Sequence, residues 1–151
     1  MEQGDVVEDF DLVDQHGATT RLGELVADGP LVLFFYPKAM TTGCTKESCH
    51  FRDLRSEFAE LGAKIVGVSA DPVDRQMEFD ERNGLGFPLL SDPDREIARR
   101  FGTKRLGPLP SKRMTFVIDS DRRVLASMRS EINMLSHADE ALEVLKARIQ
   151  D

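Results

Sequence analysis

The stretch LVLFFYPKAMTTGCTKESC, residues 31–49, joins an apolar run to both cysteines of the chain. The run at 31–36 is continuously apolar, which is typical of a strand buried on both faces of a sheet. Beyond it, apolar residues recur at helical spacing, and these are Cys44, Phe51, Leu54, Phe58 and Leu61. The pattern predicts one helix that begins near Cys44 and ends before Gly62, a plausible C-cap.

Strands and helices alternate in the sequence on both sides of this stretch. Strands are predicted at 63–70 and 87–92, in a hairpin at 9–22 and in the two halves of 114–129; helices are predicted at 73–83, 92–101 and 136–149, and a loop at 102–113. This order predicts an α/β fold, a central mixed sheet flanked by helices on both faces, with an N-terminal β-hairpin. Because no repeat or linker interrupts the pattern, we expect a single domain over residues 1–151.

Composition and charge narrow the classes of partner and location. The net charge of -7 and the sequence pI of about 5.0 argue against nucleic acid or an anionic membrane as a partner. No window approaches the roughly 18 apolar residues of a membrane span. The acidic N-terminus lacks the basic and apolar parts of a secretory signal, so a reducing, cytoplasmic location is expected.

The two cysteines lie five positions apart, Cys44 at the start of the predicted helix and Cys49 further along it. Free amide groups and the helix dipole at that start favour the thiolate form of Cys44. In an intact helix the two Cα atoms are about 8.6 Å apart, beyond the roughly 6.8 Å limit for a disulfide. A disulfide between them therefore requires the first helical turns to unwind.

Other uses of the two cysteines stay open on spacing alone. Both could be small buried side chains without a chemical role, since cysteine is often buried. A zinc site made by Cys44, Cys49 and His50 is weaker, because the spacing is unusual and only three ligands cluster. The pair is also not Cys-x-x-Cys, which disfavours an ordinary disulfide oxidoreductase.

The segment FFYPKAMTTGCTKESCHFRDL, residues 34–54, resembles the active-site region of peroxiredoxins, specifically the bacterioferritin comigratory protein or Q-type subfamily. The matching positions are Tyr36, Pro37, Thr41, Gly43, Cys44, Cys49, Phe51, Arg52 and Asp53. Similarity continues at 9–25, 88–94 and 113–119, so it covers nearly the whole chain. The resemblance implies a thioredoxin-like fold.

The resemblance also implies a thiol-dependent peroxidase. Cys44 would be the peroxidatic nucleophile, with Thr41 orienting the peroxide, Arg113 stabilising the negative charges and Pro37 shielding the pocket. Cys49 would resolve the sulfenic acid as an intramolecular disulfide, which thioredoxin or a similar dithiol would reduce. The substrate would be hydrogen peroxide or an alkyl hydroperoxide, with no metal or organic cofactor. A monomer is expected, and a homodimer stays open.

Some positions depart from the family pattern or carry smaller expectations. Ala39 stands where many relatives carry Asp, and Thr42 where many carry Pro, which bears on peroxide preference. Arg52 is expected to pair with Asp53 or neighbouring acids, with a second contribution at Cys44 as the alternative, and His137 to cap a helix or lie on the surface. A rival function is a redox-sensing or thiol-holding protein that uses the same disulfide to signal to a partner.

Overall fold

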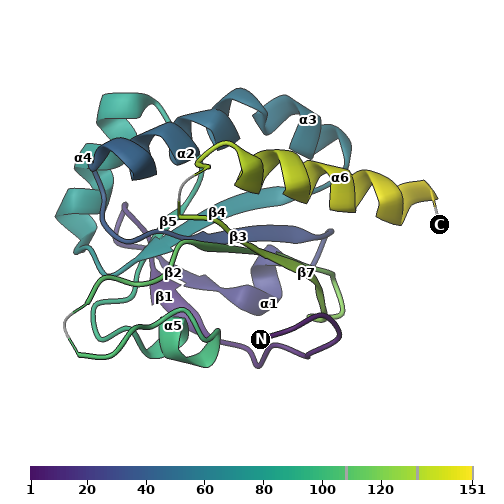
Figure 1. Ribbon diagram of the computed structural model, residues 1–151, viewed down its shortest axis with the longest axis horizontal. Coiled ribbons are helices and arrows are strands. Elements are labelled where there is room, and N and C mark those ends of the chain that lie inside the picture. The colour runs from purple at the N-terminus through teal and green to yellow at the C-terminus, as the bar shows by residue number, and fades with distance from the viewer. Residues whose placement is uncertain (108, 132, 151) are drawn as a thin grey trace.

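The structure, a computed structural model, describes residues 1–107, 109–131 and 133–150. Within these residues the strands form one seven-stranded sheet in the order β2-β1-β5-β4-β3-β6-β7, with helices on both faces (Figure 1). In chain order the elements are β1 (Asp11–Val13), β2 (Thr19–Arg21), α1 (Leu22–Leu25), β3 (Leu31–Phe35), α2 (Thr42–Asp53), α3 (Arg55–Glu60), β4 (Lys64–Ser69), α4 (Val73–Asn83), β5 (Leu89–Ser91), α5 (Glu96–Arg100), β6 (Met114–Ile118), β7 (Val124–Arg129) and α6 (Ser136–Gln150).

The sheet is mixed, as predicted. β3 lies between β4, which is parallel to it, and β6, which is antiparallel to it, and β4 is parallel to β5. The predicted hairpins β1–β2 and β6–β7 form at the two ends of the sheet. All five residues of β3 are buried, because neighbouring strands and helices cover it on every side.

Two hydrophobic cores lie on opposite faces of the sheet. Val32 and Phe34 of β3 belong to the core under α2, α3, α4 and α6, where the rings of Phe34 and Phe51 stack with centroids 4.5 Å apart. Leu33 and Phe35 belong to the other core, which α1 and α5 cover. Successive strand residues therefore serve opposite faces, and α2 is fixed to the sheet through Phe51.

The prediction of one continuous helix from about Cys44 to Leu61 is wrong only in its continuity. The helix starts at Thr42, and it is interrupted at Leu54, whose φ of -95° and ψ of 7° separate α2 from α3. Leu54 and Phe58 still face the core, so the apolar spacing continues across the break. Periodicity alone could not reveal the interruption.

The predicted helix at 92–101 is shorter than expected. Arg95 has a left-handed φ of 57°, so the helix α5 begins only at Glu96. Asp92 lies before it and accepts hydrogen bonds from the amides of Ile97 and Ala98 at 3.3 and 2.9 Å. The sequence did not predict the short helix α1, and the remaining helices and strands lie close to their predicted ranges.

Gly84 ends α4 in the left-handed conformation with φ 57°, as the Asn-Gly pair predicts. No helix among the described residues combines the length and the apolar character that crossing a membrane requires.

Candidate active site

Cys44 lies in the first turn of α2, just beyond the carboxyl end of β3. Between the two elements Met40 has a left-handed φ of 65°, and Thr41 is extended with φ -80° and ψ 157°. The Cys44 side chain is fully buried, with 0% of its surface exposed. At this place the unpaired amides of the helix start favour negative charge on the sulfur.

Arg113, the residue before β6, contacts the sulfur of Cys44. Its Nη2 lies 3.3 Å from Cys44 Sγ, and its Nη1 donates to Glu47 Oε1 at 2.8 Å. The guanidinium thus joins two groups of α2. Gly43 permits this approach, because a Cβ there would lie 3.2 Å from Nη2 and 3.1 Å from Cε of Met134. The structure therefore brings together the predicted pair Cys44 and Arg113.

Buried polar side chains hold the turn that precedes α2 in place. The amide of Ala39 donates to Asp71 Oδ2 at 2.7 Å, and so does the hydroxyl of Ser69. The hydroxyl of Tyr36 donates to Gln76 Oε1. Burial raises the pKa of Tyr36 above its ordinary value, so the phenol stays protonated and keeps donating. Ala39 contributes only its backbone amide to this anchor.

Pro37 and Thr41 lie in the same turn. Thr41 occupies the position before α2, but its side chain does not cap the helix and instead donates to the carbonyl of Lys38 at 2.8 Å. Pro37 is half-buried and lines a hollow of about 450 Å³ with Leu109 and Pro110 of the long loop. The hollow lies between the turn and that loop.

Cys49 lies further along the intact helix α2. It is half-buried, and its thiol donates to Asn83 Oδ1 at 3.7 Å. Both cysteines are free thiols. Arg52 pairs with Asp53 at 2.9 Å, as expected, and it also donates from Nη1 to the carbonyl of Asn83 at 2.5 Å.

Glu47 and His137 extend the site on the side of Arg113 away from Cys44, and the sequence predicted a part in the site for neither. The expectation that His137 caps a helix or lies on the surface is wrong, because its exposed fraction is 0%. Its Nδ1 lies 3.5 Å from Glu47 Oε2 and 2.7 Å from the hydroxyl of Thr115. Burial raises the pKa of Glu47 to about 7 and lowers the pKa of His137. The one available signal was the position of Glu47, one helical turn beyond Cys44.

The residues proposed for a zinc site do not gather around a common point. His50 lies 2.8 Å from Asp139 Oδ1, and Cys49 contacts Asn83. In the described part of the chain, no three His, Cys, Asp or Glu side chains are placed to hold a metal ion.

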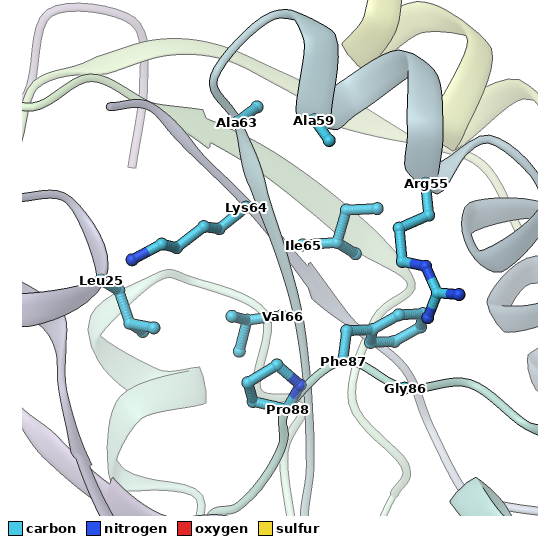
Figure 2. A pocket seen from close by; sticks show the side chains of 10 residues that line it. All are labelled: Leu25, Arg55, Ala59, Ala63, Lys64, Ile65, Val66, Gly86, Phe87 and Pro88. Atoms are coloured by element: carbon cyan, nitrogen blue, oxygen red, sulfur yellow. The ribbon is translucent and has the colours of Figure 1, made fainter. Parts of the chain in front are cut away.

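A separate cavity of about 190 Å³ lies beside the first half of β4 (Figure 2). β5 pairs with β4 only from Gly67 onward, which leaves the edge at Lys64–Val66 without a neighbouring strand. Leu25, Phe87 and Pro88 surround this edge, with Arg55 close to Phe87. None of the residues that line it belongs to the cysteine site, so the chemistry is not located there.

Comparison with known proteins shows which family the chain resembles. The sequence pattern of the AhpC/TSA family matches residues 3–127. The protein named peroxiredoxin Bcp of Bacillus subtilis is 38% identical over 152 residues, covering 97% of this chain and 96% of that protein.

Two solved structures are similar over most of the chain. The crystal structure of the peroxidoxin BcpB of Mycobacterium tuberculosis has a TM-score of 0.95 and 55% identity, and covers 97% of each chain. The bacterioferritin comigratory protein of Xanthomonas campestris, solved in a study of its alkyl peroxide reduction activity, has a TM-score of 0.84 and 35% identity, covering 92% of this chain and 91% of that one.

Proposed function

The chain belongs to the AhpC/TSA family and to the peroxiredoxins of the Bcp or Q type within it, and on that premise we propose that Cys44 is its peroxide-reducing residue. As a member it is a thiol-dependent peroxidase with a thioredoxin-like fold. The observation that supports Cys44 most is its burial at a helix start against the guanidinium of Arg113, 3.3 Å from the sulfur.

The first step is an in-line displacement on the peroxide. The thiolate of Cys44 attacks one oxygen, an S–O bond forms, the O–O bond breaks, and the electron pair leaves with the second oxygen as alkoxide or hydroxide. Arg113 and the helix start stabilise the negative charge before and during this transfer. The sulfur is oxidised to sulfenic acid, and the peroxide is reduced to alcohol or water.

The second step uses Cys49. Its thiol attacks the sulfenic sulfur, an S–S bond forms, and water leaves. On the intact helix α2 the Cα atoms of residues five apart are about 8.6 Å from each other, so the disulfide cannot close there. We infer that α2 unwinds locally between the two steps.

Thr41 and Pro37 support the first step from the turn before α2. In this proposal the hydroxyl of Thr41, which donates to the carbonyl of Lys38 in this structure, turns to the bound peroxide. Pro37 forms part of the wall and offers no backbone N–H that competes for the peroxide oxygens. Both roles rest on the position of these residues in the turn that precedes α2 and Cys44.

The substrate is a peroxide, and we propose that alkyl hydroperoxides are accepted as well as hydrogen peroxide. The Xanthomonas campestris relative supports this choice, since its structure was studied for alkyl peroxide reduction. We further propose thioredoxin or a similar dithiol as reductant, because an intramolecular disulfide needs a dithiol to return both sulfurs to thiols. The protein would act as a monomer in a reducing compartment such as the cytoplasm.

Peroxide consumption driven by thioredoxin and thioredoxin reductase tests this proposal. Wild type should turn over, Cys44→Ser should lose all activity, and Cys49→Ser should reduce one equivalent of peroxide but cycle poorly. Persisting turnover in Cys44→Ser would show that another residue reacts. Unchanged cycling in Cys49→Ser would show that an external thiol resolves the sulfenic acid.

A further inference from the structure

A buried pair of titratable side chains, Glu47 of α2 and His137 of α6, lies directly behind Arg113. Both are fully buried. Glu47 Oε1 accepts from Arg113, whereas Oε2 accepts no hydrogen bond from any described residue and lies 3.5 Å from His137 Nδ1. A carboxylate oxygen without a donor in such a place carries a large desolvation cost.

The partners of His137 fix which of its nitrogens carries a proton. Nε2 lies 2.9 Å from the carbonyl oxygen of Ser130, which can only accept, so Nε2 bears a proton. In the neutral ring Nδ1 is then an acceptor, and the hydroxyl of Thr115 at 2.7 Å donates to it. A neutral His137 therefore gives no proton to Glu47 Oε2, and an ionised Glu47 would leave this buried oxygen without a donor. One added proton, on Oε2 or on Nδ1, removes this cost.

The charges around the site agree with one stored proton. The Cys44 thiolate, the Arg113 guanidinium and an ionised Glu47 sum to one buried negative charge, which a proton on the pair neutralises. The other charged groups facing the pair are Glu131, beside the start of β6, and Glu140 of α6, both negative. They also favour retention of the proton. Burial raises the pKa of Glu47 to about 7 and lowers the pKa of His137, which places the proton on Glu47.

We propose that Glu47 and His137 hold one buried proton while Cys44 is a thiolate, and release it when Cys44 is oxidised. The proposal rests on the peroxidase function and adds a proton store to it. Peroxide reduction to the disulfide converts one thiolate, one thiol, one peroxide and one proton into a disulfide, an alcohol and a water. The alkoxide that leaves in the first step takes up one proton and the pair releases one, so the whole reaction draws no net proton from the solvent.

Two changes release the proton from the pair. Oxidation removes the negative charge of the thiolate, so the positive charge of Arg113 then favours an ionised Glu47. Unwinding of α2 also takes Glu47, which lies between the two cysteines, out of its buried position and returns its carboxyl to ordinary acidity. Glu47 and His137 touch neither sulfur nor peroxide in this account, so they are positioning residues that keep the site neutral.

Proton uptake during a single turnover tests the proposal. Reduced protein is mixed with one equivalent of hydrogen peroxide in weak buffer with a pH indicator, about one unit below the Glu47 pKa of about 7. The number of protons taken up is divided by the number of disulfides formed, and it is corrected for the fraction of Cys44 that is thiolate before mixing. Wild type should take up close to no protons, because the pair supplies the one that is needed. Glu47→Gln should take up one, because Gln has no proton to release.

The control is Glu57→Gln, an exposed carboxylate on α3 that should behave as wild type. Infrared difference spectra of wild type keep the test independent of any variant: the carbonyl band of a protonated carboxylic acid should disappear on oxidation. Uptake of one proton by wild type, or no loss of that band, overturns the proton store while leaving the peroxidase intact. If no disulfide forms at all, the proposed function itself has failed.

Discussion

At the residue scale, Arg113 shows how geometry rather than charge alone defines this site. Its planar group contacts Cys44 Sγ with one nitrogen and Glu47 Oε1 with another. Lysine keeps the charge but offers a single ammonium, which cannot make both contacts in this arrangement. The substitution therefore separates the charge of the guanidinium from its shape.

We expect Arg113→Lys to lower the second-order rate of Cys44 oxidation by roughly 10- to 100-fold, because one of two oriented donors is lost. Stopped-flow measurements with hydrogen peroxide give this rate. Arg82→Lys, on the exposed face of α4 where Arg82 pairs with Glu78, is the matched control and should change nothing. A full rate in Arg113→Lys would mean that charge is sufficient.

Glu47 also makes stability depend on pH. Its pKa is raised from 4.5 to about 7 in the folded protein, so folding favours the protonated form. Its contribution to the free energy of unfolding is complete below pH 4.5 and is lost as the pH rises to about 7, by roughly 3 kcal/mol at most. The lowered pKa of His137 acts with the opposite sign as the pH rises towards 6.5.

The difference between wild type and Glu47→Gln isolates this effect. Urea unfolding at several pH values should show that wild type loses stability relative to the variant between pH 4.5 and about 7. A constant difference across that range would mean that Glu47 has an ordinary pKa in the folded protein.

Sequence motifs could predict Cys44 and Arg113 but not the groups behind them. Both residues lie in segments whose residue pattern resembles that of the peroxiredoxins. His137 lies in the first turn of a helix, where polar side chains are usually caps or exposed. Its burial depends on α6 packing beside α2 and β6, which are distant in the sequence. The local sequence pattern cannot predict such long-range contacts.

At the element scale, α2 and α3 are tied to the end of α4 by two arginines. Arg52 donates to the carbonyl of Asn83, and Arg55 donates to the carbonyl of Leu85 at 3.0 Å. Because Cys49 lies between Cys44 and Arg52, unwinding that exposes Cys49 loosens the first of these contacts. Arg52 therefore opposes the movement that disulfide formation requires.

We expect Arg52→Gln to speed disulfide formation by roughly 3- to 10-fold without changing the rate of Cys44 oxidation, because a hydrogen bond from a charged group is lost. Two-phase stopped-flow fluorescence or quenched alkylation resolves the two steps. Over-oxidation to sulfinic acid at excess peroxide should fall in parallel. Arg82→Gln is the control. An unchanged second phase in Arg52→Gln would show that the hydrogen bond from Arg52 to Asn83 does not oppose the unwinding of α2.

The interruption at Leu54 is one place where element prediction from the sequence failed. The apolar positions on both sides keep helical spacing, since Phe51 and Phe58 pack into the same core. Their rings lie 6.0 Å apart across the break. Packing thus preserves the periodicity while the backbone departs from it, so most strands and helices were predictable and this break was not.

At the scale of the whole molecule, only one of the two hydrophobic cores packs against α2. The core under α1 and α5 lies on the face opposite α2, and we expect it to hold the sheet together when α2 unwinds. Because Phe51 lies two residues beyond Cys49 on α2, we expect the core on the α2 side to lose the stack of Phe51 on Phe34 in that movement. Oxidation is thus expected to loosen one face of the sheet only.

We expect the disulfide form to be less stable than the reduced form, by roughly 1 to 3 kcal/mol. A crosslink closing so short a loop contributes about 2 kcal/mol, whereas loss of a buried phenylalanine costs about 3 to 5 kcal/mol. Urea unfolding of the two forms measures this difference. Equal or greater stability of the oxidised form would show that α2 keeps its packing.

The central claim is that the buried sulfur of Cys44, held at a helix start against Arg113, is the group that peroxide oxidises. Mass spectrometry of the protein after one equivalent of hydrogen peroxide tests it most directly. The account predicts complete conversion to a peptide pair in which Cys44 is joined to Cys49, far faster than a free thiol reacts. A protein in which Cys44 is still open to alkylation after that treatment would contradict it.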